Sequence, residues 1–272
     1  MDFHSKIVLG KTGLNVGRLG VSSSYGAPAE AFEEAFEQGC NYFTWGTFAK
    51  GPSKEMKKAI KNIVQKGQRE QLVVALYAYF HSNILTEIYI PKRLRELGID
   101  YADVLILGYY SWHPSQSIID GVMRLKEKGI IHHIGLSGHN RKLFPELLKD
   151  ETIDIFHVRY NAVNRGAEAE VFPFLNRSDE HATKNEKPGI VSFTATKWGQ
   201  LVNQKKMPPG EKAPSAPDCY RFVLSNPAVD VCMVGARNIE MMRENLSVLK
   251  LGPMNEEEMS RMRQIGDYLK NA

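Results

Sequence analysis

Short apolar segments alternate along the chain with segments in which apolar residues recur at helical spacing. Eight of the short segments have the length and composition of buried strands. They occupy residues 18–22, 40–43, 71–77, 103–108, 131–137, 154–158, 189–193 and 229–235. Alternation of this kind predicts parallel strands joined by crossover helices.

Two of the intervening segments carry recognisable helix-end signals. In residues 28–39, Phe32 and Phe36 fall on one face of the predicted helix, and Gly39 suits its C-terminal end. Ser53 precedes the next helical segment and is placed to cap it. These signals place helix boundaries more closely than apolar spacing alone.

The number of strand–helix units favours an α/β fold of the (β/α)8 TIM barrel type, which takes about 250 residues. An open doubly wound sheet is the alternative architecture. Its first turn would carry G-x-G-x-x-G, which the stretch "GRLGVSSSYG" does not match. The barrel is therefore the predicted fold.

Two segments lie outside the repeated units. Residues 5–20 predict a two-stranded β-hairpin that plugs one end of the barrel, and residues 254–269 predict one further amphipathic helix at the C-terminal end. No linker, repeat or low-complexity tract divides the chain. Residues 1–272 are therefore predicted to form a single domain.

Composition and charge exclude several classes of protein. The chain has 43% apolar and 24% charged residues, as ordinary globular proteins do. Its net charge of +4 is spread along the sequence, without a Lys/Arg cluster interleaved with aromatic residues, so no nucleic-acid partner is predicted. No run approaches the roughly 18 apolar residues of a membrane span, and the opening residues lack the apolar core of a signal peptide, so no membrane association is predicted.

The cysteines indicate a compartment rather than a site. Cys40, Cys219 and Cys232 are odd in number and widely spaced, with no C-x-x-C pair. This pattern predicts buried thiols in a reducing compartment, the cytoplasm. No pair of His, Cys or carboxylate residues has metal-ligand spacing, so no metal is predicted.

Chemistry in such barrels lies at the C-terminal ends of the strands. The turn Gly235–Asn238 follows the eighth predicted strand and leads into a helix that Asn238 is placed to cap. Free N–H groups, the helix dipole and Arg237 would together bind an anion there. An ordinary turn with a surface arginine is the alternative, and the segment alone leaves both open.

Four stretches of the sequence carry a resemblance to the aldo-keto reductases. "LGKTGLNVGRLGVSSSYG" is similar to the family's opening hairpin and first strand, and "LRELGIDYADVLIL" to the approach to its fourth strand. "LKEKGIIHHIGLSGHN" is similar to the fifth strand, and "FVLSNPAVDVCMVGARNIEMMREN" to the eighth strand and cofactor turn. The resemblance runs from the hairpin to about Glu258. It implies a (β/α)8 barrel that binds NADP(H) across the strand ends without a Rossmann motif.

The resemblance also implies which residues hold the cofactor. Ser137 matches the serine that contacts the carboxamide, and Gly138 stands where an asparagine is common. His157 stands where the family usually has glutamine, and Phe193 falls at the aromatic residue that stacks on the nicotinamide. The remaining predicted cofactor residues are Ser22, Ser23, Gly235, Arg237, Asn238, Glu244 and Asn245. Arg237 favours NADP(H), and NAD(H) remains the alternative.

The family's catalytic residues do not carry over. It reduces carbonyls with a tyrosine acid, a lysine that lowers the pKa of that tyrosine, an aspartate and a histidine. The family's motifs, laid on this sequence, place the aspartate at Thr44, the tyrosine at Ala49, the lysine at Tyr77 and the histidine at Gly108. An unperturbed tyrosine has a pKa of about 10, and a tuned general acid contributes about 10²–10⁴-fold. Ordinary carbonyl reduction is therefore not supported.

Three functional hypotheses follow. The first is an NADP(H)-binding barrel without the usual reductase activity: a sensor, a binding protein or a scaffold. The second is an NADPH-dependent oxidoreductase in which Tyr77 acts as the acid, with Lys197 lowering a tyrosine pKa if it reaches inward. The third is a binding module without nucleotide, in which Arg237 and the aromatic floor hold another anionic ligand. A planar or apolar small-molecule ligand is expected at the mouth, because aromatic residues follow the strands at Trp45, Tyr79, Tyr109 and Tyr110.

Overall fold

Eight parallel strands close into a barrel in the computed structural model, which describes residues 2–46, 53–175 and 187–271. Each strand pairs with its neighbours in chain order, and the last strand pairs with the first. The barrel strands are β3 (Leu19–Ser22), β4 (Tyr42–Trp45), β5 (Val73–Ala78), β6 (Ala102–Leu107), β7 (Ile131–Gly138), β8 (Ile155–Arg159), β9 (Gly189–Phe193) and β10 (Val231–Val234). This closed order confirms the predicted barrel and excludes the doubly wound sheet.

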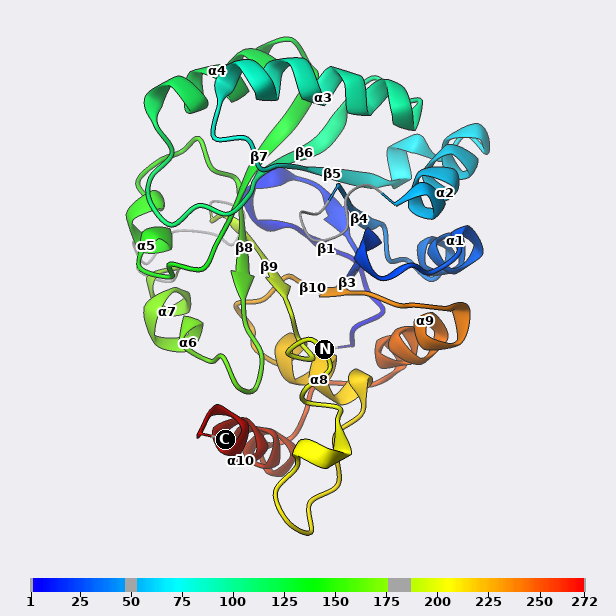
Figure 1. Ribbon diagram of the computed structural model, residues 1–272, viewed down its shortest axis with the longest axis vertical. Helices are drawn as coiled ribbons and strands as arrows, with labels where there is room; N and C mark the ends of the chain where they lie inside the picture. Colours follow the sequence, from blue (N-terminus) through cyan, green and yellow to red (C-terminus); the bar gives the residue numbers. More distant parts are fainter. Residues whose placement is uncertain (1, 47–52, 176–186, 272) are drawn as a thin grey trace.

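Helices surround the strands, as Figure 1 shows. Most follow a strand and return the chain to the next one. They are α1 (Ala29–Glu37), α2 (Lys54–Gln65), α3 (Asn83–Leu97), α4 (Gln116–Glu127), α5 (Leu143–Leu147), α6 (Ala167–Glu170), α7 (Phe172–Leu175), α8 (Ala216–Leu224), α9 (Ile239–Leu246) and α10 (Glu256–Asn271). The last of these, α10, is the predicted additional C-terminal helix.

An N-terminal hairpin closes the end of the barrel at which the strands begin. Strands β1 (Ile7–Val8) and β2 (Asn15–Val16) pair antiparallel. Leu9 and Val16 are fully buried and belong to the apolar cluster inside the barrel. A Cβ on Gly189 would lie 2.6 Å from the Leu9 side chain, so the plug packs directly on the start of β9. The predicted hairpin is confirmed.

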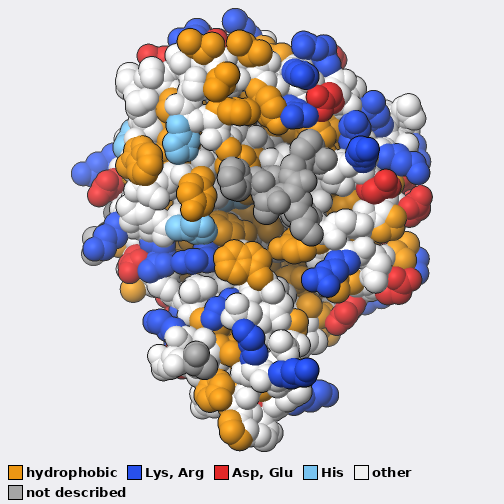
Figure 2. Space-filling view, viewed as in Figure 1, with side chains coloured by type: hydrophobic (Ala, Val, Ile, Leu, Met, Phe, Trp, Pro, Cys, Tyr) orange, Lys and Arg blue, Asp and Glu red, His pale blue; other side chains and the backbone are white. Residues whose placement is uncertain are grey.

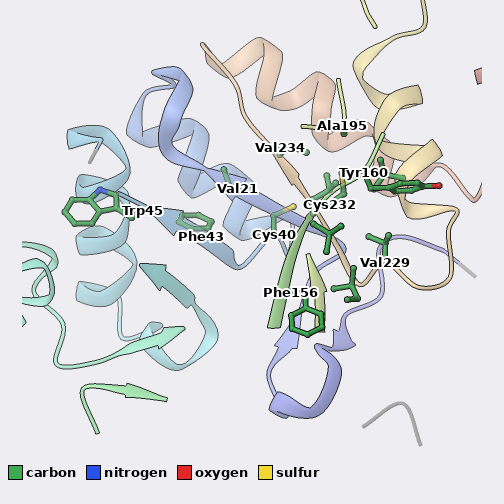
Figure 3. Packing of buried hydrophobic residues seen from close by; sticks show 14 of the residues in the cluster. Val21, Cys40, Phe43, Trp45, Phe156, Tyr160, Ala195, Val229, Cys232 and Val234 are labelled. Carbon is green, nitrogen blue, oxygen red and sulfur yellow. The ribbon is translucent and has the colours of Figure 1, made fainter. Parts of the chain in front are cut away.

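Alternate residues of each strand face the barrel interior or the helices. On β8, Ile155 and His157 face inward, while Phe156 and Val158 pack in the outer cluster. Figure 3 shows the outer cluster, with Phe156 among residues contributed by several strands. Arg159 lies two residues after His157 and therefore faces inward as well. Because it is the last residue of β8, it lies at the C-terminal end of the barrel.

Polar side chains near the start of every second strand accept a backbone N–H from the preceding strand. Asn41 lies just before β4, Asp103 is the second residue of β6, and Asp154 and Asp230 lie just before β8 and β10. The hydrogen bonds run to Asn41 from Gly17 N at 3.0 Å, to Asp103 from Val74 N at 2.7 Å, to Asp154 from Ile134 N at 2.9 Å, and to Asp230 from Ile190 N at 2.9 Å. These bonds fix the stagger of neighbouring strands.

The predicted boundaries agree with the strands to within two residues at each end. Ser53 caps α2 by accepting the N–H of Met56 at 3.2 Å, as predicted. Helix α3 is not marked by the sequence pattern, because Pro91 lies inside it and Ile84 and Ile88 are exposed. No described helix is long and apolar enough to cross a membrane. The three cysteines are buried and unpaired.

Removing the Asp103 carboxylate should destabilise the barrel. Burial raises the pKa of Asp103, and the neighbouring Arg69, 2.9 Å away, opposes that rise. Asp103→Ala removes the carboxylate that pairs with the partly buried Arg69 and accepts the Val74 N–H, so we expect the free energy of unfolding to fall by about 3 kcal/mol. Urea denaturation followed by circular dichroism measures the change. Glu127→Ala, at an exposed position on α4, is the control and should change stability by less than about 0.5 kcal/mol. Equal midpoints would contradict the assigned role of Asp103.

Candidate functional site

The C-terminal ends of the strands bring several of the predicted residues around one mouth of the barrel. Thr44 and Tyr77 lie on the adjacent strands β4 and β5, and Ser137 and His157 lie in register on the adjacent strands β7 and β8. Phe193 ends β9 in register with Arg159. Figure 2 shows hydrophobic and histidine side chains gathered around the centre of one face of the molecule.

His157 joins two tyrosines inside the barrel. Its Nε2 lies 2.9 Å from the Tyr42 hydroxyl, and its Nδ1 lies 3.1 Å from the Tyr77 hydroxyl. Burial lowers the pKa of His157 to about 3, so the ring is neutral and has one donor and one acceptor nitrogen. One tyrosine therefore donates to the ring and the other accepts from it. Both ring nitrogens are satisfied without a ligand.

Tyr77 is not tuned to donate a proton. Burial raises the pKa of its phenol, and the neighbouring Tyr79 raises it further, while a hydrogen bond with Ser137 opposes these effects. Within the described chain, no Lys or Arg contributes to lowering this pKa. The hydrogen-bond chain continues through His157 to Tyr42, which is fully buried. This arrangement holds a phenol in place but does not activate it.

The ring of Tyr79 covers Gly108. A Cβ on Gly108 would lie 2.6 Å from Tyr79 Cδ1, and the Tyr79 ring stacks on Tyr77 with centroids 5.3 Å apart and planes 5° apart. A side chain at position 108 would therefore displace this stacked pair. Two tyrosine rings occupy the space beside the ends of β5 and β6.

The turn before α9 has the features predicted for an anion site. Asn238 caps the helix by accepting the N–H of Met241 at 2.8 Å, and the Arg237 side chain is exposed. Asn245 is 1% exposed and donates from Nδ2 to the Gly235 carbonyl at 3.2 Å. Its Oδ1 is buried and has no hydrogen-bond partner within the described chain. An acceptor is thus left open beside the helix N-terminus.

Two residues of the first strand–helix connection lie beside this turn. The Tyr25 ring packs on Gly235, where a Cβ would lie 2.1 Å from Tyr25 Cδ2, and Arg237 lies near enough to act electrostatically on its phenol. The buried hydroxyl of Ser23 has no partner among the residues that the structure describes. Ser22 ends β3, and Glu244 is exposed on α9. The open acceptor, the free cation and the capped helix fit a nucleotide with an adenine amino group and a phosphate.

Phe193 is oriented by an unusual backbone conformation. Thr194, the next residue, has φ of 60°, which is rare for a β-branched residue. The fully buried Asn161 donates to the Thr194 carbonyl at 2.9 Å and holds this conformation. The Phe193 ring is partly exposed at the mouth, where an aromatic floor for a planar ring is predicted.

Other predicted residues are not brought to the mouth. Trp45 is 2% exposed and packs among the helices, donating to the Ser53 carbonyl at 2.9 Å, because its parity on β4 is opposite to that of Thr44. Tyr110 is fully buried. Lys197 does not reach inward, since its Nζ donates to the Leu269 carbonyl of α10 at 3.2 Å. Ala49 lies outside the described residues.

Arg159, His139 and Tyr25 are not among the site residues predicted from the sequence, and the structure places them at or beside the mouth. The signal for Arg159 is its spacing, two residues after His157 on a strand whose alternate residues face inward. His139 directly follows β7, and its ring lies 5.9 Å from that of Phe193. Tyr25 has no comparable signal, because it lies in a short turn after β3.

A cavity of 610 Å³ lies at the other end of the molecule, bordered by Gly10, Pro188, Pro227 and Asp230. It adjoins the point where the described chain resumes at residue 187, and none of the predicted site residues lines it. Across residues 2–46, 53–175 and 187–271, no three His, Cys, Asp or Glu residues are grouped so as to hold a metal ion. The barrel mouth remains the candidate site.

Known proteins share this fold and sequence pattern. The chain is 23% identical over 293 residues to a protein named "Uncharacterized oxidoreductase YqkF" of Bacillus subtilis (strain 168), covering 94% of this chain and 92% of that protein. It is 23% identical over 210 residues to the "NADH-specific methylglyoxal reductase" of Escherichia coli (strain K12), covering 66% of this chain and 64% of that protein. The solved holo form of aldo-keto reductase AKR11C1 from Bacillus halodurans superposes with a TM-score of 0.78 at 20% identity, covering 96% of each chain.

A family model described as the Aldo/keto reductase family matches residues 6–211 and 200–267. The match includes the hairpin, the barrel strands and the turn before α9. On this match over most of its length, the chain belongs to the aldo/keto reductase family.

Proposed function

We propose that the barrel mouth binds a nicotinamide dinucleotide, with the adenosine end at the turn Gly235–Asn238 and the nicotinamide near Phe193. The observation that carries the proposal is the buried Oδ1 of Asn245, which has no partner in the described structure and lies beside a capped helix N-terminus. An adenine amino group would satisfy it. The uncommitted Arg237 favours a phosphorylated ribose, and so NADP(H) over NAD(H).

The names of the relatives support a nicotinamide cofactor without settling which one. The Bacillus subtilis relative is named an oxidoreductase, and the Escherichia coli relative is named as NADH-specific. A protein with an arginine at this turn is expected to prefer NADPH, because the guanidinium pairs with a 2′-phosphate. We therefore treat NADP(H) as the proposal and NAD(H) as its alternative.

We further propose that the protein does not reduce carbonyls by the family's usual tyrosine-acid route. The bound cofactor would supply a hydride, and the carbonyl oxygen would then need a proton from the protein. Tyr77 is the phenol nearest to that role, and burial and Tyr79 both raise its pKa. Its partner His157 is neutral. A cofactor-binding protein without efficient carbonyl reduction fits these features best. The alternative is an oxidoreductase that uses Tyr77.

The cytoplasmic location and the small planar or apolar ligand stay predictions. The ligand follows from the tyrosine and phenylalanine rings at the mouth, and the location from the buried, unpaired thiols.

Nucleotide titration tests cofactor binding directly. We expect NADPH to bind in the micromolar range, and Arg237→Ala to weaken NADPH by about 10- to 100-fold, since a charge-assisted hydrogen bond contributes about 1.5–3 kcal/mol. NADH affinity should change little. Arg243→Ala is the matched control, because Arg243 lies on α9, the helix that follows the turn, but pairs with Glu34 at 2.9 Å. Calorimetry measures all three proteins. No binding of either nucleotide would remove the proposal.

Steady-state turnover tests the second proposal. With NADPH and methylglyoxal, the wild type should oxidise NADPH no faster than the Tyr77→Phe variant, because the phenol is not an active acid. Absorbance at the NADPH band follows the reaction, and a reductase of the same family serves as the positive control. Activity in the wild type that Tyr77→Phe abolishes would instead establish the alternative, an oxidoreductase that uses Tyr77.

The neutral state of His157 has a measurable consequence for stability. Its pKa is about 3 when folded and about 6.5 when unfolded, so the unfolded chain binds more protons between these values. Stability due to this group is complete above pH 6.5 and should fall by about 1.4 kcal/mol per pH unit below it. His157→Gln should lose this part of the slope. Urea denaturation at pH 7.5, 6 and 5 compares the variants, and equal slopes would contradict a neutral, buried ring.

A further inference from the structure

Arg159 is a cation at the barrel mouth that the proposed cofactor site does not use. It ends β8 on the inward-facing side, two residues beyond His157 and in register with Phe193. Its side chain is partly buried, and its Nε is buried without a hydrogen-bond partner among the described residues. The buried Nε–H has lost its hydrogen bonds to water, and an anion paired with this guanidinium would compensate that loss.

No described acidic group compensates the charge of Arg159. The groups that lower its pKa are, first, burial itself and, second, the like charge of Arg141. Arg141 in turn donates to the Glu170 carboxylate, so Glu170 is already paired with another arginine. The positive charge of Arg159 also acts on His139: burial lowers the pKa of His139, and Arg159 lowers it further. The mouth therefore carries an unbalanced positive charge on β8.

Aromatic rings flank this charge. The His139 ring lies 5.9 Å from Phe193 and 5.8 Å from Tyr109, which is 66% exposed. A planar group that enters beside Phe193 would meet ring faces and edges, and an anionic substituent on it would reach the guanidinium. The aromatic rings favour a planar group and the guanidinium favours an anion, so together they favour a planar ligand that carries a negative charge.

We propose that Arg159 binds the carboxylate of a small planar ligand at the barrel mouth, beside the nicotinamide position. This inference rests on the proposed function, because it takes the mouth as the ligand end of a cofactor site. The planar fork of a guanidinium matches a carboxylate with two parallel N–H···O bonds. Tyr109 and His139 line the side of the mouth on which the ligand's ring would lie.

The test uses benzoate as the probe and benzamide, which has nearly the same shape without the charge, as its matched control. Calorimetry measures both with the wild-type protein, alone and saturated with NADP⁺. We expect benzoate to bind at least about tenfold more tightly than benzamide, as one charge-assisted pair would give. Equal affinities, or no saturable binding of benzoate, would overturn the proposal.

Variants assign the effect to one residue. Arg159→Met and Arg159→Gln should reduce benzoate affinity to that of benzamide, while leaving NADPH affinity unchanged. Arg237→Ala should weaken NADPH binding and leave benzoate binding unchanged. Loss of the cofactor site can therefore be distinguished from loss of the carboxylate site. If both Arg159 variants keep the preference for benzoate, the proposal is wrong. If they weaken NADPH instead, Arg159 belongs to the cofactor site and the proposal also fails. Near-ultraviolet circular dichroism checks that each variant is folded.

Discussion

The hydrogen bonds at the start of alternate strands set the geometry on which the site depends. Asp103, Asp154 and Asp230 each accept a backbone N–H from the preceding strand, and Asn41 does the same for the first pair. Because side chains alternate with a period of two, a slip of one residue would turn His157 toward the helices. The contacts among His157, Tyr42 and Tyr77 at the other end therefore rest on bonds made at the start of the strands.

The sequence predicts the fold better than the site, for a physical reason. Strands, hairpin and caps depend on local patterns, and Ser53 and Asn238 cap the helices as expected. Barrel strands are buried on both faces, so apolar composition does not reveal which parity points inward. That is why Trp45 is grouped with the mouth residues by sequence but packs among the helices. Arg159 is missed for the same reason, because its spacing of two residues from His157 points it inward only once the inward-facing positions of β8 are known.

Burial at the mouth acts in opposite directions on proton transfer and on anion binding. It raises the pKa of Tyr77 and lowers that of His157, so neither group exchanges a proton readily near neutral pH. The same exclusion of water strengthens the attraction between Arg159 and an anion. A site with this buried environment favours binding an anionic ligand over donating a proton to it. The proposed loss of carbonyl reduction and the proposed carboxylate site thus follow from one environment.

Two of the positions that the resemblance assigns to catalysis, Tyr77 and Gly108, are packed together through Tyr79, so a change at either one would disturb the other. A side chain at position 108 meets the Tyr79 ring at 2.6 Å, and Tyr79 stacks on Tyr77. Tyr77 is held by His157, which also holds Tyr42. Any histidine introduced at position 108 would have to displace the stacked tyrosines and disturb that chain. The aromatic and histidine side chains at the mouth therefore form one connected packing arrangement rather than a set of independent side chains.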